Sequence, residues 1–196
     1  MARKNQLTKS DHLSYEEYLR LLDCLHKDKL YKWEMYAMLS FCTACRASDV
    51  TQFRWRDIMN VSYICITEKK TKKTREVLIN PSVQKKFHEL YELLGRPDMK
   101  DYVLPNSASG DTPITIQHIN RKLKVFKYTY HLDIQHFSTH TFRKTFGRYV
   151  YDSNNHSAES LLLLNTILNH SDINVTKTYI GITQDEINSI FKSIRF

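Results

Sequence analysis

Apolar residues recur along most of the chain at the spacing of α-helices. Near its start, Tyr18, Leu22 and Leu25 share one helical face and follow Ser14 and Glu17, which are spaced as a capping box. The same period, with capping and breaking residues at its ends, predicts further helices over residues 31–42, 47–56, 81–94, 115–126, 140–152, 160–168 and 184–194.

Two short segments alternate apolar and polar residues, as β-strands do. They cover residues 62–67 and 76–79, and residues 68–75 between them carry four lysines and one arginine. This pattern predicts a β-hairpin with a basic tip. The expected fold class is therefore mainly α with a small antiparallel β-sheet (α+β), in one domain.

Composition narrows the choice of function. The chain has 196 residues, of which 41% are hydrophobic, and only four are glycine and four proline, which argues against disorder and against a turn-rich β-sandwich. Lysine and arginine total 29 against 21 acidic residues, so the formal charge of +8 favours a polyanionic partner. No stretch of eighteen apolar residues predicts a membrane span, and no secretory leader opens the chain. We expect an intracellular, cytoplasmic protein.

The four cysteines do not predict a metal or redox site. They are Cys24, Cys42, Cys45 and Cys65, and the second and third form a lone C-x-x-C inside an apolar helical stretch. A zinc site needs further ligands at a matching spacing, and a thioredoxin-type site needs a βαβ setting. We expect this pair to be small buried hydrophobic residues.

A histidine cluster offers only a superficial likeness to a metal site. His131, His136 and His140 lie within ten residues, but no nearby cysteine or pair of carboxylates completes a ligand set. No metal and no other cofactor is expected.

Three segments hold residues suited to phosphodiester chemistry. Without a metal, such chemistry needs a nucleophile, cations around the non-bridging oxygens, an acid for the leaving oxygen and a base for the nucleophile. Arg46 lies at a predicted turn between two apolar helices. His140 and Arg143 are three apart and share a helical face, and Tyr179 follows His170 by nine residues.

These segments resemble the two signature boxes of the tyrosine recombinases, the phage integrase family. The family's first box reads roughly Gly-x-Arg, an acidic residue, then Leu-x-Trp-x-Asp-Ile. Residues of this chain stand in that order, namely Arg46, Asp49, Trp55, Asp57 and Ile58.

The second box also matches in order and spacing. In the family it reads His-x-x-Arg, then Leu-Gly-His-Ser about 25 residues on, then a tyrosine nine residues after that histidine. The matching residues here are His140, Arg143, His170, Ser171 and Tyr179. Together the boxes extend the resemblance from about residue 13 to residue 196, nearly the whole chain.

The resemblance implies a role for each of these residues. Arg46 and Arg143 would hold the scissile phosphate, and His170 would donate a hydrogen bond to it. Tyr179 would attack phosphorus and hold DNA by a 3′-phosphotyrosine bond, without a metal, while His140 takes the phenol proton.

The family also carries a lysine on the hairpin between the boxes, which protonates the leaving 5′ oxygen. Lys70 matches that position best, and Lys69, Lys72 and Lys73 are close enough in sequence to compete. The same cluster could instead bind the DNA backbone by charge or be a solvated tip. The residues expected to bind DNA are Lys69, Lys72, Lys73, Arg75 and Lys144.

Two positions depart from the family pattern. Ala44 and Cys45 stand where the family has a glycine and its neighbour before the first arginine, and Asn169 replaces the glycine of Leu-Gly-His. Asparagine tolerates the left-handed backbone conformation better than most residues, so the turn before His170 can survive.

The resemblance also implies an organisation and an assembly. Residues 1–12 would be an N-terminal extension and 13–196 the catalytic domain, with no N-terminal core-binding domain. The chain would then be a catalytic fragment or resemble the short invertases of the family. Its partner would be double-stranded DNA, on which it forms a homotetramer, while alone it is monomeric or associates weakly. The helix predicted over 184–194 would pack on its own core or on a neighbouring protomer.

Two other functions share this pattern. A type IB topoisomerase uses the same chemistry but relaxes any supercoiled DNA as a monomer. A catalytically silent DNA-binding regulator would keep the fold and lose catalysis. The regulator is disfavoured because every expected catalytic position is filled.

Overall fold

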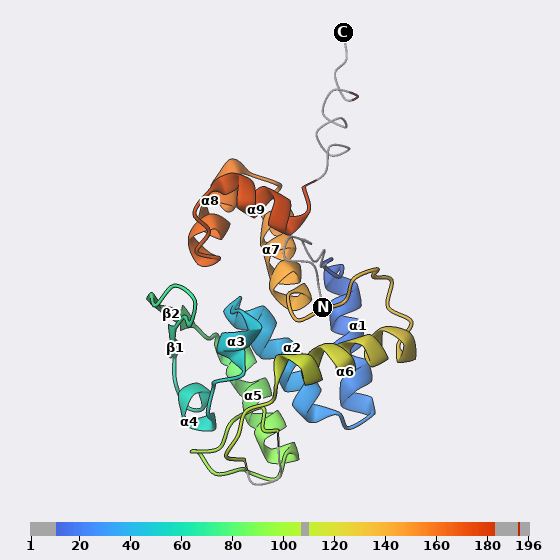
Figure 1. Ribbon diagram of the computed structural model, residues 1–196, viewed down its shortest axis with the longest axis vertical. Coiled ribbons are helices and arrows are strands. Elements are labelled where there is room, and N and C mark those ends of the chain that lie inside the picture. Colours follow the sequence, from blue (N-terminus) through green and yellow to red (C-terminus); the bar gives the residue numbers. More distant parts are fainter. Residues whose placement is uncertain (1–10, 107–109, 183–191, 193–196) are drawn as a thin grey trace.

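The computed structural model describes residues 11–106, 110–182 and 192 of the chain. Its helices and strands are shown in Figure 1. In chain order they are α1 (Tyr15–Lys27), α2 (Tyr31–Thr43), α3 (Ala47–Val50), α4 (Trp55–Ile58), β1 (Tyr63–Thr67), β2 (Thr74–Leu78), α5 (Pro81–Leu93), α6 (Ile116–Thr129), α7 (Thr141–Ser153), α8 (Ala158–Ile167) and α9 (Ile173–Ile180).

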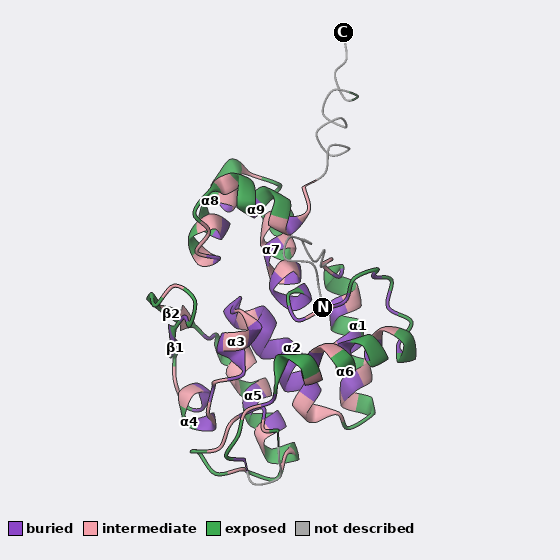
Figure 2. Ribbon diagram, viewed as in Figure 1, coloured by how far each residue is buried: buried purple, intermediate pink, exposed green. Residues whose placement is uncertain are grey.

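Helix α2 is the centre of the core. Nearly all of its side chains are buried, and it packs against α1, α3, α5 and α7 (Figure 2). An apolar helix of this kind is stable only when neighbours cover every face, which explains the ring of helices around it. Nowhere in the described ranges is a helix both long enough and apolar enough to cross a membrane.

Several helices begin where the sequence predicts them, because a capping side chain is present. Ser14 accepts a hydrogen bond from the backbone of Glu17, and Asn80 and Thr115 cap α5 and α6 in the same way. Proline follows Asn80 at the first position of α5, where its missing N–H costs nothing.

The single helix predicted over residues 47–56 is wrong. The structure has two short helices there, α3 and α4, separated by an extended Arg54. The backbone of Arg54 forms an isolated β-bridge with Tyr102, and Trp55 donates its N–H to the carbonyl of Asp101 at 3.1 Å. This pairing with a distant loop replaces the helical hydrogen bonds. Buried residues still recur at the predicted spacing, although the helix is interrupted.

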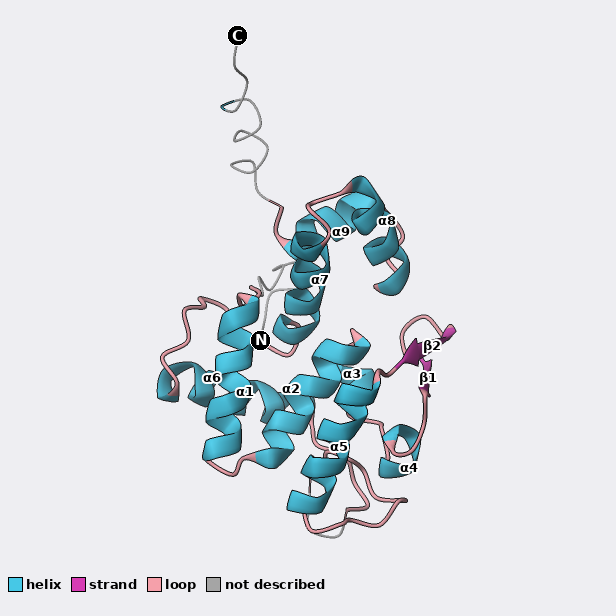
Figure 3. Ribbon diagram, turned by 180° about the vertical axis from the view of Figure 1, so that it is seen from behind, coloured by secondary structure: helices cyan, strands magenta, loops and turns pink. Residues whose placement is uncertain are grey.

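The hairpin forms as the alternating pattern predicts. Strands β1 and β2 pair antiparallel, from Tyr63 opposite Leu78 to Thr67 opposite Thr74. Ile64 and Ile66 point into the core and the intervening side chains point outward. Viewed from behind, the hairpin lies at the edge of the molecule (Figure 3), and we refer to residues 68–73, which join its strands, as the hairpin tip.

Helix α9 was not predicted from the sequence, yet it carries Tyr179. Asp172 caps its first turn and Gly181 ends it in a left-handed conformation. It packs on α7 and α8, and its close approach to α7 depends on Gly147, since a Cβ there would lie 2.8 Å from Cγ2 of the buried Ile180. The helix predicted over 184–194 lies outside the described residues.

The cysteine prediction is partly confirmed. Cys45 is buried and Cys42 is half-buried, as expected for small apolar residues. All four cysteines are free thiols, and Cys65 is exposed on β1.

Candidate active site

Arg46 begins helix α3 directly after the turn that ends α2. Ala44, at the family's glycine position, adopts a left-handed conformation with φ of 50° and turns the chain toward the hairpin. The guanidinium of Arg46 then donates Nη1 to Oε2 of Glu68 at 2.6 Å. One edge of this cation is therefore held by the Glu68 carboxylate.

Glu68, the first residue of the hairpin tip, is a buried carboxylate with several partners. Its side chain is 1% exposed and contacts Arg46, the hydroxyl of Thr71 at 2.8 Å, Nδ2 of Asn169 at 3.2 Å and Nε of Arg75 at 3.6 Å. Burial raises the pKa of Glu68, but the hydrogen bonds from Thr71, Asn169 and Arg46 outweigh it and lower the pKa below its ordinary value. The carboxylate is thus ionised and acts as an anchor.

Arg143 lies on the inner face of α7 and is almost completely buried, with 2% exposed. Its Nη2 donates to the carbonyl of Leu168 at 2.6 Å, at the end of α8. Its Nη1 is buried and has no hydrogen-bond partner among the described residues. Because a buried guanidinium donor without a partner is unfavourable, this atom is a strong candidate for contact with an anionic ligand.

His170 is held by a chain of hydrogen bonds from α8 and α9. Its Nδ1 lies 3.0 Å from the hydroxyl oxygen of Thr176, and that hydroxyl donates to Oδ1 of Asn165 at 2.8 Å. Asn165 in turn donates Nδ2 to the carbonyl of His170 at 3.2 Å, which fixes the orientation of the amide. Since the threonine proton goes to Asn165, the threonine oxygen accepts Nδ1–H of the imidazole.

The electrostatic surroundings keep His170 neutral in the free protein. Burial, followed by the charges of Arg143 and Arg46, lowers its pKa to about 4. With Nδ1 protonated toward Thr176, the lone pair is on Nε2.

Tyr179 projects from the last turn of α9 into the same space. Its ring lies 5.0 Å from the ring of His170 in an edge-on arrangement, and 5.9 Å and 5.1 Å from the cationic groups of Arg143 and Lys144. Its hydroxyl is buried without a hydrogen-bond partner in the described part of the chain. Burial raises the pKa of the phenol, while the charges of Arg143 and Arg46 oppose that rise.

His140 occupies the N-cap position of α7, one turn before Arg143, without a side-chain capping hydrogen bond. Desolvation lowers its pKa first, and the charges of Arg143, Lys144, Arg46 and Lys70 lower it further. The residue is nevertheless exposed to solvent. The imidazole of His140 is therefore neutral at pH 7, and the charge of Lys70 on the hairpin tip contributes to lowering its pKa.

The other predicted basic residues divide into two groups. Lys69, Lys70, Lys72 and Lys73 are exposed on the hairpin tip. Arg75 is turned inward, where it donates Nη2 to the carbonyl of Thr43 at 2.7 Å and to Sγ of Cys45 at 3.2 Å.

The sequence did not single out four residues that organise this site, namely Glu68, Asn165, Thr176 and, as a contact residue, Asn169. Each is a common polar residue. Glu68 and Asn169 are about a hundred residues apart, and Asn165 and Thr176 pair with His170 and with each other across the turn from α8 to α9, so no single helical spacing marks them.

Acidic partners also fix the start of the hairpin tip. Asp49, the acidic residue of the first box, is buried and accepts the backbone N–H of Lys69 at 3.0 Å.

In the described ranges no group of three or more histidine, cysteine or acidic side chains is placed to hold a metal ion.

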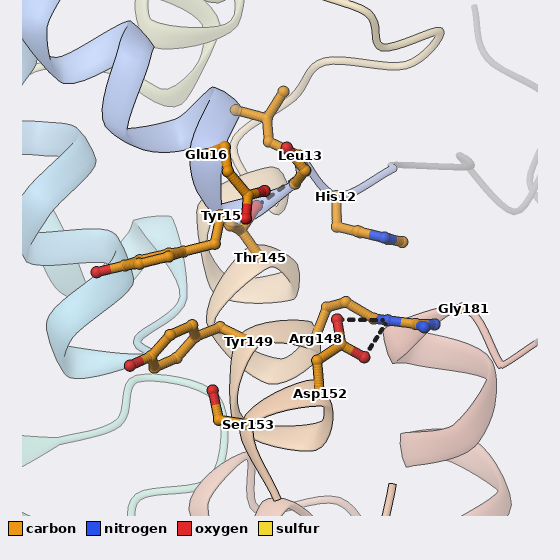
Figure 4. Close-up of a pocket in the computed structure, with 11 residues that line it drawn as sticks. His12, Leu13, Tyr15, Glu16, Thr145, Arg148, Tyr149, Asp152, Ser153 and Gly181 are labelled. Carbon is orange, nitrogen blue, oxygen red and sulfur yellow. Dashed lines mark hydrogen bonds and ion pairs between the residues drawn. The ribbon is translucent and has the colours of Figure 1, made fainter. Parts of the chain in front are cut away.

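The surface has two hollows of similar size, and one of them borders this cluster at His140. One, of about 580 Å³, is lined by His140 together with Lys124 and Lys127 of α6. The other, of about 610 Å³, lies between the start of α1, helix α7 and Gly181, and Figure 4 shows Arg148 and Asp152 paired along its α7 wall. The second hollow contains none of the predicted site residues.

Comparison with known proteins decides the family. The profile of the phage integrase family matches residues 11–186. The chain belongs to the phage integrase family. All the residues that converge in the site lie within the matched range.

A relative in Bacillus subtilis (strain 168), described as a "Probable integrase/recombinase YoeC", is 33% identical over 151 residues, which are 76% of this chain and 77% of that protein. This description agrees with the family that the profile identifies.

Solved structures of tyrosine recombinases share the fold of this family member. The XerA recombinase superposes with a TM-score of 0.69 at 18% identity, covering 94% of this chain and 66% of that one. The Tn1549 transposon integrase in complex with transposon right-end DNA gives 0.68 at 17%, with 97% and 67% covered.

XerH bound to its difH substrate in a pre-cleavage complex gives a TM-score of 0.67 at 17% identity. It covers 98% of this chain, which spans just 57% of the XerH chain.

Proposed function

We propose that this protein is a site-specific DNA recombinase or integrase that cleaves and rejoins DNA through a 3′-phosphotyrosine intermediate. One observation carries the proposal. A buried guanidinium nitrogen of Arg143 and a buried hydroxyl of Tyr179, both without partners among the described residues, lie together beside His170. A phosphodiester group bound there would accept a hydrogen bond from the guanidinium. Its phosphorus would be the electrophile that the phenol oxygen attacks.

The two guanidinium groups are suited to holding the scissile phosphate. Arg46 is anchored on one edge by Glu68, and Arg143 on one nitrogen by the carbonyl of Leu168. Both are thereby oriented before the ligand arrives, so little reorganisation is needed as negative charge builds on the non-bridging oxygens. Three to four kcal/mol of transition-state stabilisation is the approximate contribution of one such donor. These fixed cations supply in this mechanism the charge that a metal would supply in others.

His170 would take up a proton when the phosphate binds. In the free protein its Nε2 carries a lone pair, because Nδ1–H is donated to Thr176. The incoming negative charge offsets Arg143 and Arg46, which hold its pKa down. Protonated at Nε2, the imidazole then donates to a phosphate oxygen.

Cleavage is one displacement at phosphorus. The Oη of Tyr179 forms a bond to phosphorus while the bond from phosphorus to the 5′ oxygen breaks. The phenol proton goes to His140, and Lys70 gives a proton to the leaving 5′ oxygen. Rejoining is the reverse, with a 5′ hydroxyl attacking the phosphotyrosine.

Basic groups around the site support double-stranded DNA as the partner. The exposed lysines of the hairpin tip lie on one side, and Lys124 and Lys127 line the hollow beside His140. Lys144, whose Nζ lies 5.1 Å from the Tyr179 ring, would contact the phosphate nearest the nucleophile. We further propose that residues 13–196 form the catalytic domain, which is monomeric or weakly associated alone and forms a homotetramer on two DNA sites.

A suicide substrate tests the mechanism. A DNA duplex nicked close to the cleavage point releases a short oligonucleotide after attack, so the covalent adduct accumulates and can be counted on a denaturing gel. The wild-type protein should form the adduct, and Tyr179→Phe should form none while binding DNA as before. Arg46→Ala and Arg143→Ala should each slow adduct formation at least 100-fold, as loss of a transition-state donor does. An adduct on Tyr179→Phe would refute the assignment of the nucleophile.

The product distinguishes the alternatives. A type IB topoisomerase relaxes any supercoiled plasmid, whereas a recombinase needs two specific sites. A silent DNA-binding regulator forms no adduct on any substrate.

A further inference from the structure

The side chain of Asn169 bridges two segments that are about a hundred residues apart in sequence. Its Nδ2 lies 3.2 Å from Oε2 of Glu68 and 3.2 Å from the hydroxyl oxygen of Thr71, and its Oδ1 accepts from Nζ of Lys73 at 3.2 Å. All three partners belong to the hairpin tip, while Asn169 itself belongs to the turn that leads into His170.

The three partners of Asn169 bracket Lys70. Glu68 precedes this lysine by two residues, Thr71 follows it directly and Lys73 lies three residues after it. The tip is closed on itself by backbone bonds, from the N–H of Glu68 to the carbonyl of Lys73 at 3.0 Å and from the N–H of Lys72 to the carbonyl of Glu68 at 2.8 Å. A tip that is closed in this way moves as a unit, so fastening its ends fixes the backbone from which Lys70 extends.

Position 169 imposes a backbone conformation that few residues accept. Its φ is 50°, in the left-handed region where glycine is unstrained and asparagine is the best tolerated alternative. Glycine would satisfy the turn equally well but has no side chain to reach the hairpin tip. The asparagine therefore adds hydrogen bonds that a glycine at this position lacks.

We propose that Asn169 is a positioning residue that fastens the hairpin tip to the His170 turn and so holds Lys70 over the leaving 5′ oxygen. This positioning role rests on the proposed function. Without the amide, the contacts that remain between the tip and the site are those of Glu68 with Arg46 and of the Lys69 N–H with Asp49, both on the side nearest Arg46. The lysine would then sample many positions and protonate the leaving oxygen less often.

A substrate with sulfur in place of the bridging 5′ oxygen gives the specific readout. A thiolate leaves without being protonated, because its conjugate acid is far stronger than an alcohol, so the reaction no longer needs a general acid. A variant whose only defect is a misplaced acid is slow on the oxygen substrate and normal on the sulfur substrate. A variant with a damaged phosphate site is slow on both.

The test uses Asn169→Gly, which keeps the turn, and Asn155→Gly as the matched control. Asn155 also has a left-handed backbone, with φ of 51°, in the exposed loop between α7 and α8. We expect Asn169→Gly to slow adduct formation about 10- to 100-fold on the oxygen substrate and less than about threefold on the sulfur substrate. Asn155→Gly should match the wild type on both, and Lys70→Ala should reproduce the pattern of Asn169→Gly. Equal slowing on both substrates, or normal rates on the oxygen substrate, would overturn the proposal.

Hydrogen exchange separates this proposal from the function on which it rests. In the free protein, the amides of residues 69–73 should exchange faster in Asn169→Gly than in the wild type or in Asn155→Gly, because the tip has lost its fastening. This result does not depend on any DNA chemistry. Unchanged exchange would refute the positioning role, whereas faster exchange without a Tyr179-dependent adduct in the wild type would refute the proposed function alone.

Discussion

The hydroxyl oxygen of Thr176 lies 3.0 Å from Nδ1 of His170, and the threonine is completely buried. The threonine hydroxyl donates its proton to Oδ1 of Asn165 at 2.8 Å, so its oxygen can only accept from the imidazole. The hydrogen of the neutral ring is therefore on Nδ1. Two residues of the α8–α9 segment therefore set the tautomer of a histidine in the candidate active site.

Replacing this hydroxyl tests the arrangement. Thr176→Val keeps the shape of the side chain but leaves Nδ1–H and the Asn165 oxygen without a partner. We expect adduct formation to slow by about tenfold or more and the free energy of unfolding to fall by about 1–3 kcal/mol, the cost of leaving a buried polar group unpaired. Thr176→Ser should restore most of the rate. Nitrogen NMR of the His170 ring should show Nδ1 protonated in the wild type and mixed tautomers in Thr176→Val.

Gly147 sets the distance between α7 and α9, and thereby the place of Tyr179. A Cβ at this position would lie 2.8 Å from Cγ2 of Ile180, next in sequence to Tyr179. We expect Gly147→Ala to lower the free energy of unfolding by about 1–3 kcal/mol through overpacking, and to slow adduct formation more than it weakens DNA binding. Gly95→Ala is the control. A Cβ at position 95 meets no atom within 4 Å, so this substitution introduces backbone strain at φ of 85° but no overpacking. A Gly147→Ala protein with wild-type stability and rate would contradict this account of helix packing.

Acidification should destabilise the protein through its histidines before its carboxylates respond. His170 titrates near pH 4 in the folded protein but near 6.5 when unfolded, since burial and then Arg143 and Arg46 lower its pKa. Between these values the unfolded chain binds more protons, so stability rises with pH and is lost as pH falls from 6.5 toward 4. His12, His118 and His140 act in the same direction.

Denaturant unfolding at several pH values between 6.5 and 4.5 measures this slope. Above about pH 5.5, Glu68, whose pKa is lowered below 4.5, is ionised in both states and contributes little. Closer to pH 4.5 its carboxyl binds a proton in the unfolded chain first, which adds to the slope in the same direction. His170→Gln should flatten the slope. An unchanged slope in the variant would show that His170 binds its proton equally well in the folded and unfolded protein.

Glu68 is the shared partner of two cations, so its charge should matter more than its shape. Glu68→Gln leaves Arg46 and Arg75 without their anion in a largely buried setting. We expect a loss of roughly 3 kcal/mol of stability, near the lower end of the cost of removing one member of a buried ion pair. Glu76→Gln, on the exposed side of β2, is the control and should change stability by less than about 0.5 kcal/mol. Chemical denaturation of the three proteins checks this, and similar values for both variants would contradict it.

The sequence predicted those features that arise from local patterns. The capped helices α1, α5 and α6, the alternating hairpin and the central apolar helix each depend on residues close together in the chain, and all are present. The left-handed turn at Asn169 was also foreseen, from the tolerance of asparagine for that conformation.

The features that escaped prediction depend on distant partners. The interruption between α3 and α4 follows from the pairing of Arg54 with Tyr102, a loop residue that no local pattern connects to it. Helix α9 is short and mostly polar on its outer side, so its period is weak, and its stability comes from packing on α7 and α8. Likewise the partners of Glu68 become neighbours only in the folded chain.

The bridge between Asn169 and the hairpin tip links the evolution of two segments that are far apart in the chain. A relative that carries glycine at position 169 has nothing to offer the hydroxyl at position 71, so selection on that residue relaxes, while the carboxylate at position 68 still holds Arg46 and Arg75. Aligned relatives should therefore change at positions 71 and 169 together, as residues in spatial contact do. Exchanging either segment alone between two relatives should impair a chimaera that exchanging both would rescue.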